Sequence, residues 1–176
     1  INNDPLAYSV QRVIDTSVGV IVGLIINYTM ARPNYYNNIM KEFRNINSLC
    51  KNSLKEMFIE DKDFNINKIE EKIRASENIY SKLIDELNYS KKDFNLDIIE
   101  KSMDLCKQIY FHINSIKLLE KESFLNKDTH RKLRKIYKNE KIKVEIKEDE
   151  SPVFNFHLNK IIDKTRALEA LIGINN

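Results

Sequence analysis

The hydrophobic positions divide the chain into two parts with different patterns. In residues 13–33, VIDTSVGVIVGLIINYTMARP, apolar residues cover every face of a helix, and Asp15 is the only charge among the 19 residues between Arg12 and Arg32. As a helix these residues would extend about 28 Å, close to the roughly 30 Å hydrocarbon core of a bilayer. We therefore interpret residues 1–33 as a transmembrane helix with its flank. A hydrophobic helix buried in a soluble bundle is the alternative.

The residues that follow this apolar stretch predict its end and its orientation. Tyr28 and the Arg32-Pro33 pair are typical of a membrane interface, where an aromatic ring and a cation precede a helix breaker. Basic residues also gather after the stretch, whereas only Arg12 precedes it; they are Arg32, Lys41, Arg44, Lys51 and Lys55. Because cytoplasmic flanks carry the excess of Lys and Arg, we expect a plasma or inner membrane protein with residues 34–176 in the cytoplasm.

From Asn34 onward the apolar residues recur with a helical period instead. This pattern predicts amphipathic helices at about 35–59, 66–89, 95–121 and 153–173, with Asn65 capping the second and Gly173 stopping the last. The predicted core positions are Ile39, Phe43, Ile46, Cys50, Leu54, Met57, Ile69, Ile73, Tyr80, Leu83, Leu87, Leu96, Ile99, Met103, Cys106, Ile109, Ile113, Ile116, Phe154, Leu158, Ile161, Thr165, Leu168 and Ile172. Short links at 60–65 and 90–94 favour antiparallel neighbours. The predicted fold is all-α: a transmembrane helix, then an up-down-up-down four-helix bundle with a long third connection.

The long connection, residues 122–152, has local signals of its own. We expect a short helix near 128–140, capped by Asp128. The segment IKVEI, 142–146, alternates like a strand but has no evident partner strand. KEDES at 147–151, followed by Pro152, predicts an acidic exposed turn.

Composition agrees with long helices and narrows the chemistry. The 176 residues include only three glycines and three prolines, and 29 basic residues nearly balance 26 acidic ones, so total charge does not indicate nucleic acid. Cys50 and Cys106 fall at apolar positions of the helical pattern, which predicts buried free thiols; a disulfide is the alternative. The apolar stretch is too long for a secretory signal and lacks a cleavage site.

One face of the apolar stretch is polar or small. Asp15, Gly19, Gly23 and Asn27 recur every four residues; with the neighbouring Arg12 and Thr16 they form what we call the polar stripe. Gly-xxx-Gly lets another helix approach closely, and an ionisable group in a membrane needs a protein or aqueous neighbour. We therefore expect the stripe to pack against other transmembrane helices of the same protein or of a second subunit, and we expect a homo-oligomer.

The segment RVIDTSVGVIVGLIIN resembles the last span of the aromatic acid exporter family, bacterial membrane proteins related to the fusaric-acid-resistance type of efflux protein. The shared pattern is an Arg followed by Asp-Thr and then a small-residue apolar helix ending in Asn. Residues 34–176 match that family only in their arrangement as a charged helical tail. The resemblance implies that the chain, which begins at Ile1, is the final membrane helix plus the cytoplasmic C-terminal domain of a multi-pass exporter of aromatic or related organic acids, with a role in assembly or regulation.

Candidate catalytic chemistry is sparse. His112, His130 and His157 are far apart in sequence and lack metal-ligand spacing, so we interpret them as structural and expect no metal site. The sequence offers no phosphate-binding glycine loop and no nucleophile with a base. We expect neither a cofactor nor enzymatic activity.

The strongest local charge is the run HRKLRKIYKNEKIK at 130–143. Its basic patch comprises Arg131, Lys132, Arg134, Lys135, Lys138, Lys141 and Lys143. A solvated helix face is the default interpretation. Anionic lipid is disfavoured, because the predicted topology places this connection at the end of the bundle far from the bilayer. An acidic partner, an anionic ligand or nucleic acid remain as alternatives, and nucleic acid is the weakest of them for a chain of balanced charge.

Three hypotheses follow. The first is the exporter domain just described, and it requires further apolar segments upstream of Ile1. The second is a single-span, membrane-anchored sensor or scaffold whose bundle binds a protein partner. The third is a soluble bundle that buries residues 13–31.

Overall fold

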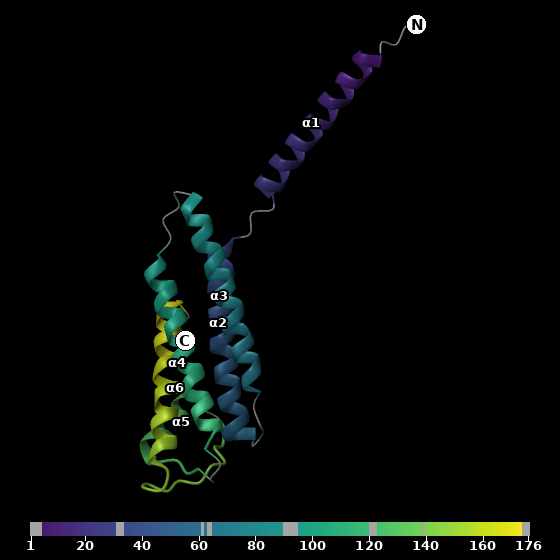
Figure 1. The fold of residues 1–176 in the computed structure, drawn as a ribbon. Coiled ribbons are helices and arrows are strands. Elements are labelled where there is room, and N and C mark those ends of the chain that lie inside the picture. The colour runs from purple at the N-terminus through teal and green to yellow at the C-terminus, as the bar shows by residue number, and fades with distance from the viewer. Residues whose placement is uncertain are drawn as a thin grey trace. The chain divides into compact units, whose positions relative to one another are not determined.

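The computed structural model of the chain is helical, with no named strand among the residues it describes (Figure 1). It describes residues 5–30, 34–60, 62, 65–89, 95–119, 123–138 and 140–173. The helices are α1 (Pro5–Met30), α2 (Tyr35–Lys55), α3 (Ile66–Tyr89), α4 (Leu96–Lys117), α5 (Lys127–Ile136) and α6 (Pro152–Leu171), and a π-helical turn, η1 (Glu56–Glu60), continues α2. The chain divides into two compact units, one that ends at Asn34 and one that begins at Tyr35.

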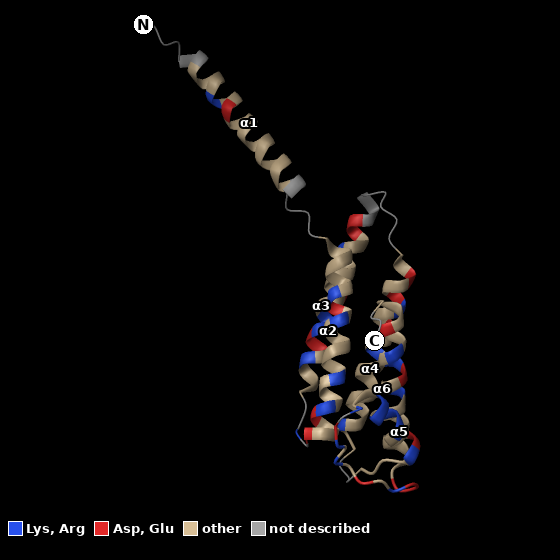
Figure 2. Cartoon of the chain, turned by 180° about the vertical axis from the view of Figure 1, so that it is seen from behind, with Lys and Arg blue, Asp and Glu red and all other residues tan. Residues whose placement is uncertain are grey.

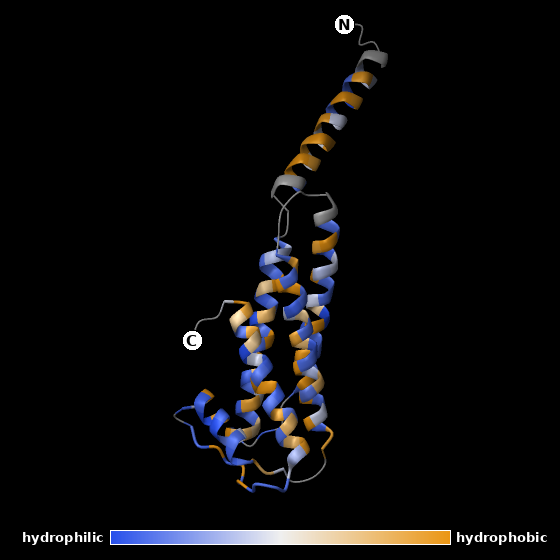
Figure 3. Cartoon of the chain, turned by 90° about the vertical axis from the view of Figure 1, so that its left-hand side faces the viewer, coloured by the Kyte–Doolittle hydropathy of each residue, from blue (hydrophilic) through white to orange (hydrophobic). Residues whose placement is uncertain are grey.

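The first unit contains α1, a helix that exposes apolar side chains on all its faces. Every residue from 8 to 27 is exposed, and Figure 3 shows the helix as mostly hydrophobic along its length. The window Tyr8–Asn27 is long and apolar enough to span a membrane, and none of it is buried within the chain. The expected interfacial end, with the Tyr28 side chain and Arg32-Pro33, lies outside the described residues.

The second unit is built around a single hydrophobic core. The long helices α2, α3, α4 and α6 lie side by side, with α2 packed mainly on α3 and α4 mainly on α6 (Figure 1). The predicted core stripes are largely confirmed. All five predicted positions of α6, Ile172 directly after it, and all predicted positions of α4 except Leu96 are buried. Tyr80, Leu96 and Met57 pack against the core but remain partly exposed. The side chain of Leu87 lies outside the described residues.

One helix start differs from the prediction because a different side chain caps it. The short helix α5 begins at Lys127, and its cap is Asn126 rather than Asp128, because Asn126 Oδ1 accepts a hydrogen bond from the Thr129 backbone N–H at 2.8 Å. Asp128 lies in the first turn and pairs with Arg131 at 2.6 Å. The predicted stop at Gly173 agrees with its φ of 69°, a left-handed conformation that glycine adopts without a Cβ clash.

The segment IKVEI forms no named strand among the described residues, in agreement with the expected lack of a partner strand, but its last residue makes a single bridge. Leu125 and Ile146 form an isolated parallel bridge, in which Leu125 N–H donates to Glu145 O and Lys147 N–H donates to Leu125 O, both at 3.0 Å. Lys143 N–H also donates to the carbonyl of Phe58 at 2.9 Å. These bonds attach the long connection to the core without forming a sheet. The acidic turn that follows is exposed at residues 148–150, as predicted.

Both cysteines are buried free thiols, as predicted. Burial raises the pKa of Cys50 to about 12, and burial together with the nearby Cys50 raises the pKa of Cys106. Because the thiolate is the reactive form, we expect neither cysteine to react with a chromogenic disulfide reagent at pH 8 in the folded chain. In urea both should react within the mixing time. Stoichiometric labelling of the folded chain would contradict this burial.

Candidate functional site

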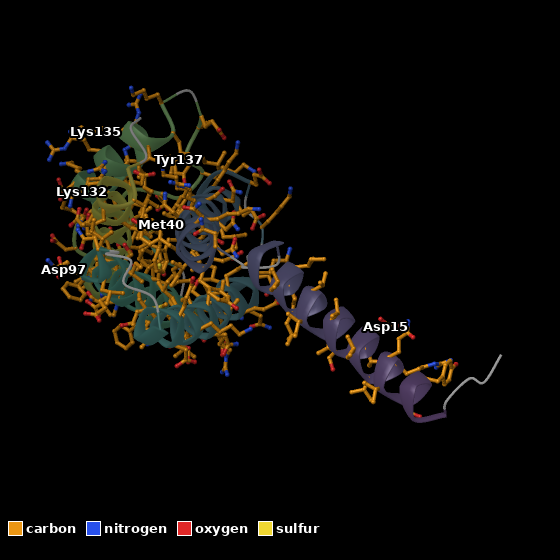
Figure 4. The ribbon with its side chains drawn as sticks, turned by 90° about the horizontal axis from the view of Figure 1, so that it is seen from above. Asp15, Met40, Asp97, Lys132, Lys135 and Tyr137 are labelled. Carbon is orange, nitrogen blue, oxygen red and sulfur yellow. The ribbon has the colours of Figure 1, made fainter. Side chains whose placement is uncertain are left out.

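The structure places the polar stripe of α1 on an exposed surface. Thr16 Oγ1 donates to the Arg12 carbonyl at 2.8 Å, and Arg12 Nε donates to Tyr8 Oη at 3.2 Å. A Cβ built on Gly19 or Gly23 would meet no atom of the described residues within 4 Å, so this face of α1 has room for another helix. Figure 2 shows the charged residues of α1 confined to one part of an otherwise uncharged helix, and Figure 4 labels Asp15 there.

The second unit has a cleft of about 500 Å³ between α2, α6 and the end of α5. Its apolar lining comes from all three helices and includes Leu54, Ile136 and Ile162. Its charged lining also comes from several elements, and consists of Lys51, Lys135, Lys138, Glu140, Arg166 and Glu169. We call this hollow the basic cleft. Figure 4 shows Lys135 and Tyr137 on the same side of the helical body, with Met40 in its interior.

The two carboxylates of the basic cleft are already neutralised by the protein. Glu169 is only 5 % exposed, pairs with Lys51 and accepts a hydrogen bond from Asn47 Nδ2 at 2.9 Å. Glu140 pairs with Lys55 at 2.7 Å, and this hydrogen bond raises the pKa of the Lys55 ammonium. A buried carboxylate is tolerable only when it is paired and hydrogen-bonded. The remaining cations of the cleft therefore determine its electrostatic sign.

Those cations are Lys135, Lys138 and Arg166, which are exposed and make no ion pair with the residues the structure describes. The wall that carries two of them is held in place by Tyr137, whose Oη donates to the Lys51 carbonyl of α2 at 2.6 Å. Burial, and then the nearby Glu140, raise the pKa of Tyr137, so the phenol remains a donor. The cleft is positive and has a wall anchored to the bundle.

The structure separates the predicted basic patch into paired and unpaired members. Arg131 pairs with Asp128, and Lys132 pairs with Asp128 at 3.4 Å and with Asp163 of α6 at 3.8 Å. Lys143 Nζ donates to the Glu60 carbonyl at 3.2 Å, and Lys141 is exposed beside it in sequence. On the outer side of α5 a shallow hollow of about 350 Å³ is lined entirely by basic side chains, namely His130, Arg131, Arg134, Lys135 and Lys138. Figure 2 shows Lys and Arg gathered on α5.

A histidine pair joins α4 to α6, and sequence reasoning missed it. The Nδ1 atoms of His112 and His157 lie 2.8 Å apart, so one ring donates to the other and at least one ring is neutral. The rings of Phe111 and Phe156 flank the pair at centroid distances of 5.2–6.2 Å. The two histidines are 45 residues apart in the sequence. They meet only because α4 and α6 pack side by side, so no local sequence motif indicates the pair.

We expect acid to destabilise the second unit through this pair. Burial, and then the charges of His157, Lys164 and Lys160, lower the pKa of His112. Below the ordinary histidine value of 6.5 the unfolded chain binds a proton that the folded chain resists, so stability falls as pH falls. Thermal unfolding at pH 7.5, 6.5 and 5.5 should show a decline that His112→Asn reduces. The matched control, His130→Asn, should keep the wild-type decline; an unchanged decline in His112→Asn would contradict the role of the pair.

No group of three or more His, Cys, Asp or Glu side chains that could hold a metal lies among the described residues. What the structure brings together instead is a positive cleft with an apolar lining, a basic hollow beside it and an exposed apolar helix. Comparisons of the chain with protein-family models, with curated proteins and with solved structures find no match.

Proposed function

We propose that the chain is the last membrane helix and the cytoplasmic helical domain of a membrane exporter of aromatic or related organic acids. α1 is the membrane span, and the second unit acts in assembly or regulation rather than in catalysis. The observation that carries the membrane part is the exposure of every residue from 8 to 27 on an apolar helix. In water such a surface is far larger than the apolar patches that soluble monomers expose.

The polar stripe supports a span that packs against other spans. Asp15 and Asn27 are costly neighbours for lipid, and the empty space over Gly19 and Gly23 accommodates a second helix closely. This arrangement suits the multi-pass exporter, whose other helices would cover the stripe. The resemblance of Arg12, Asp15 and Thr16 to the exporter pattern is the basis for the proposed substrate class.

The second unit supports a bundle of alternating helices. Consecutive long helices pack on one another, α2 on α3, α3 on α4 and α4 on α6, which favours the up-down-up-down topology. The basic residues that follow α1 in the sequence favour its placement in the cytoplasm.

The complete reading frame and an export assay test this proposal together. Further apolar segments should precede residue 1, and cells that express the full-length protein should accumulate less of an added aromatic acid than cells carrying an Asp15→Asn variant. A reading frame without other spans would contradict the exporter. Equal accumulation of the aromatic acid in the two cell lines would show that Asp15 has no role in export.

The second candidate is a single-span anchor that carries a scaffold domain, and the open face at Gly23 favours it independently. In this case the stripe would be covered only by a second copy of α1. We expect Gly23→Ile to abolish dimers in detergent, because its side chain fills the space that the second helix needs. Val22→Ile, on a neighbouring face, is the control and should leave the dimer intact in analytical ultracentrifugation. Dimers that survive Gly23→Ile would contradict this packing.

A further inference from the structure

We propose that the basic cleft binds a small organic anion with an apolar body. The cleft volume of about 500 Å³ falls within the range of small-molecule sites. This proposal rests on the second unit alone and does not depend on the membrane role of α1.

The charge of the cleft selects an anion. Lys51 and Lys55 already neutralise Glu169 and Glu140, so a cationic ligand has no free carboxylate to bind. Lys135, Lys138 and Arg166 remain without an ion pair among the described residues and come from two sides, the end of α5 and α6. An arginine and two lysines around one opening suit a carboxylate or a similar compact anionic group.

The other lining residues select an apolar body. Leu54 and Ile162 are buried core residues that also line the cleft, and Ile136 and Tyr137 form its α5 side. A ligand body that covers the partly exposed Ile136 and Tyr137 removes apolar surface from water, which a bare inorganic anion cannot do. Thr165 also lines the cleft, and its buried Oγ1 has no hydrogen-bond partner among the residues that the structure describes. The wall therefore has a polar group whose hydrogen bond is not used within the protein.

The basic hollow on α5 adds a route of entry. Lys135 and Lys138 line both the hollow and the cleft, so the positive surface is continuous from the outer side of α5 to the cleft. Charge of one sign around a concave site raises the local concentration of oppositely charged ligands. The lining of the hollow consists of basic residues, whereas the cleft adds Leu54, Ile136 and Ile162, and this places the apolar body of the ligand in the cleft rather than on α5.

Fluorine NMR of 4-fluorobenzoate with the full chain in detergent tests the proposal. We expect saturable line broadening of 4-fluorobenzoate, at least tenfold weaker binding of the neutral 4-fluorobenzamide, and poor competition by inorganic phosphate. The double variant Lys135→Gln/Arg166→Gln should weaken binding of 4-fluorobenzoate at least tenfold. Both side chains are exposed, so the thermal unfolding curve should stay unchanged and exclude misfolding.

The matched control is Lys68→Gln/Lys117→Gln, which removes two exposed lysines from α3 and α4 outside the cleft. It should bind 4-fluorobenzoate as the wild type does. Equal binding by the cleft variant and the wild type would overturn the proposal, because the signal would then come from the micelle or another surface. If 4-fluorobenzamide bound as tightly as 4-fluorobenzoate, the proposal that the cleft prefers an anion would be wrong. If inorganic phosphate competed fully, the proposal that the cleft requires an apolar ligand body would be wrong.

Discussion

Two lysines introduced at Ile21 and Leu24 should release the chain from membranes. Both side chains are exposed on α1. Helical geometry places Ile21 opposite Gly19 and Gly23 and Leu24 between these two faces, on the side expected to meet lipid. A lysine near the centre of a span costs roughly 2.5–3.5 kcal/mol, so two cost roughly 5–7 kcal/mol. This shifts the partition equilibrium by more than about a thousandfold.

The measurement is extraction of membranes at alkaline pH followed by ultracentrifugation. The wild-type chain should stay in the pellet, and the Ile21→Lys/Leu24→Lys variant should move to the supernatant or be degraded. The control, Ile21→Leu/Leu24→Ile, keeps the hydrophobicity and should stay in the pellet. A lysine variant that remains in the pellet as fully as the wild type would contradict the account of this face.

Truncation of Phe43 to alanine should strongly destabilise the second unit. Phe43 is 0 % exposed in the centre of α2, within the core that α2, α3, α4 and α6 share. Loss of a buried phenylalanine ring costs about 3–5 kcal/mol, from lost apolar burial and from the cavity left behind. For a domain of this size we expect the unfolding temperature to fall by about 10 °C.

Phe111→Ala provides the matched control, since this phenylalanine is 62 % exposed on α4. It should change the free energy of unfolding by less than about 1 kcal/mol. Urea unfolding monitored by circular dichroism separates the two cases. Similar losses in both variants would contradict the assignment of the core.

The long-range periodicity of the sequence predicted most of the helical architecture. Stripes such as Ile99, Met103 and Cys106 repeat every three to four residues and continue over many turns. An error at one position therefore does not change which face of the helix is predicted to be buried. Boundaries were less predictable, because Asn126 and Asp128 are both good caps and only the hydrogen bond to Thr129 distinguishes them. The bridge between Leu125 and Ile146 joins two segments on either side of α5. The packing of α5 brings these segments together, and no local sequence pattern indicates this packing.

The basic cleft was predictable only in part. Lys135 and Lys138 belong to the charged run that the sequence singles out, but Lys51 and Arg166 lie on helices whose charges are spread evenly. Their meeting depends on the register and rotation of α2 and α6 about the core. The pair of His112 and His157 has the same origin. Local patterns report which face of a helix is apolar, and they do not report which polar side chains of two helices lie opposite each other.

Cysteine accessibility in intact cells tests the central claim most directly, because it reports both the span and its orientation. The native thiols are buried, so a membrane-impermeant maleimide should report only a cysteine introduced at Asn3 or at the exposed Lys101 of α4. We predict that Asn3→Cys labels in intact cells and that Lys101→Cys labels only after lysis. Labelling of both positions only after lysis, or of both in intact cells, would contradict a membrane-spanning α1 with the helical domain in the cytoplasm.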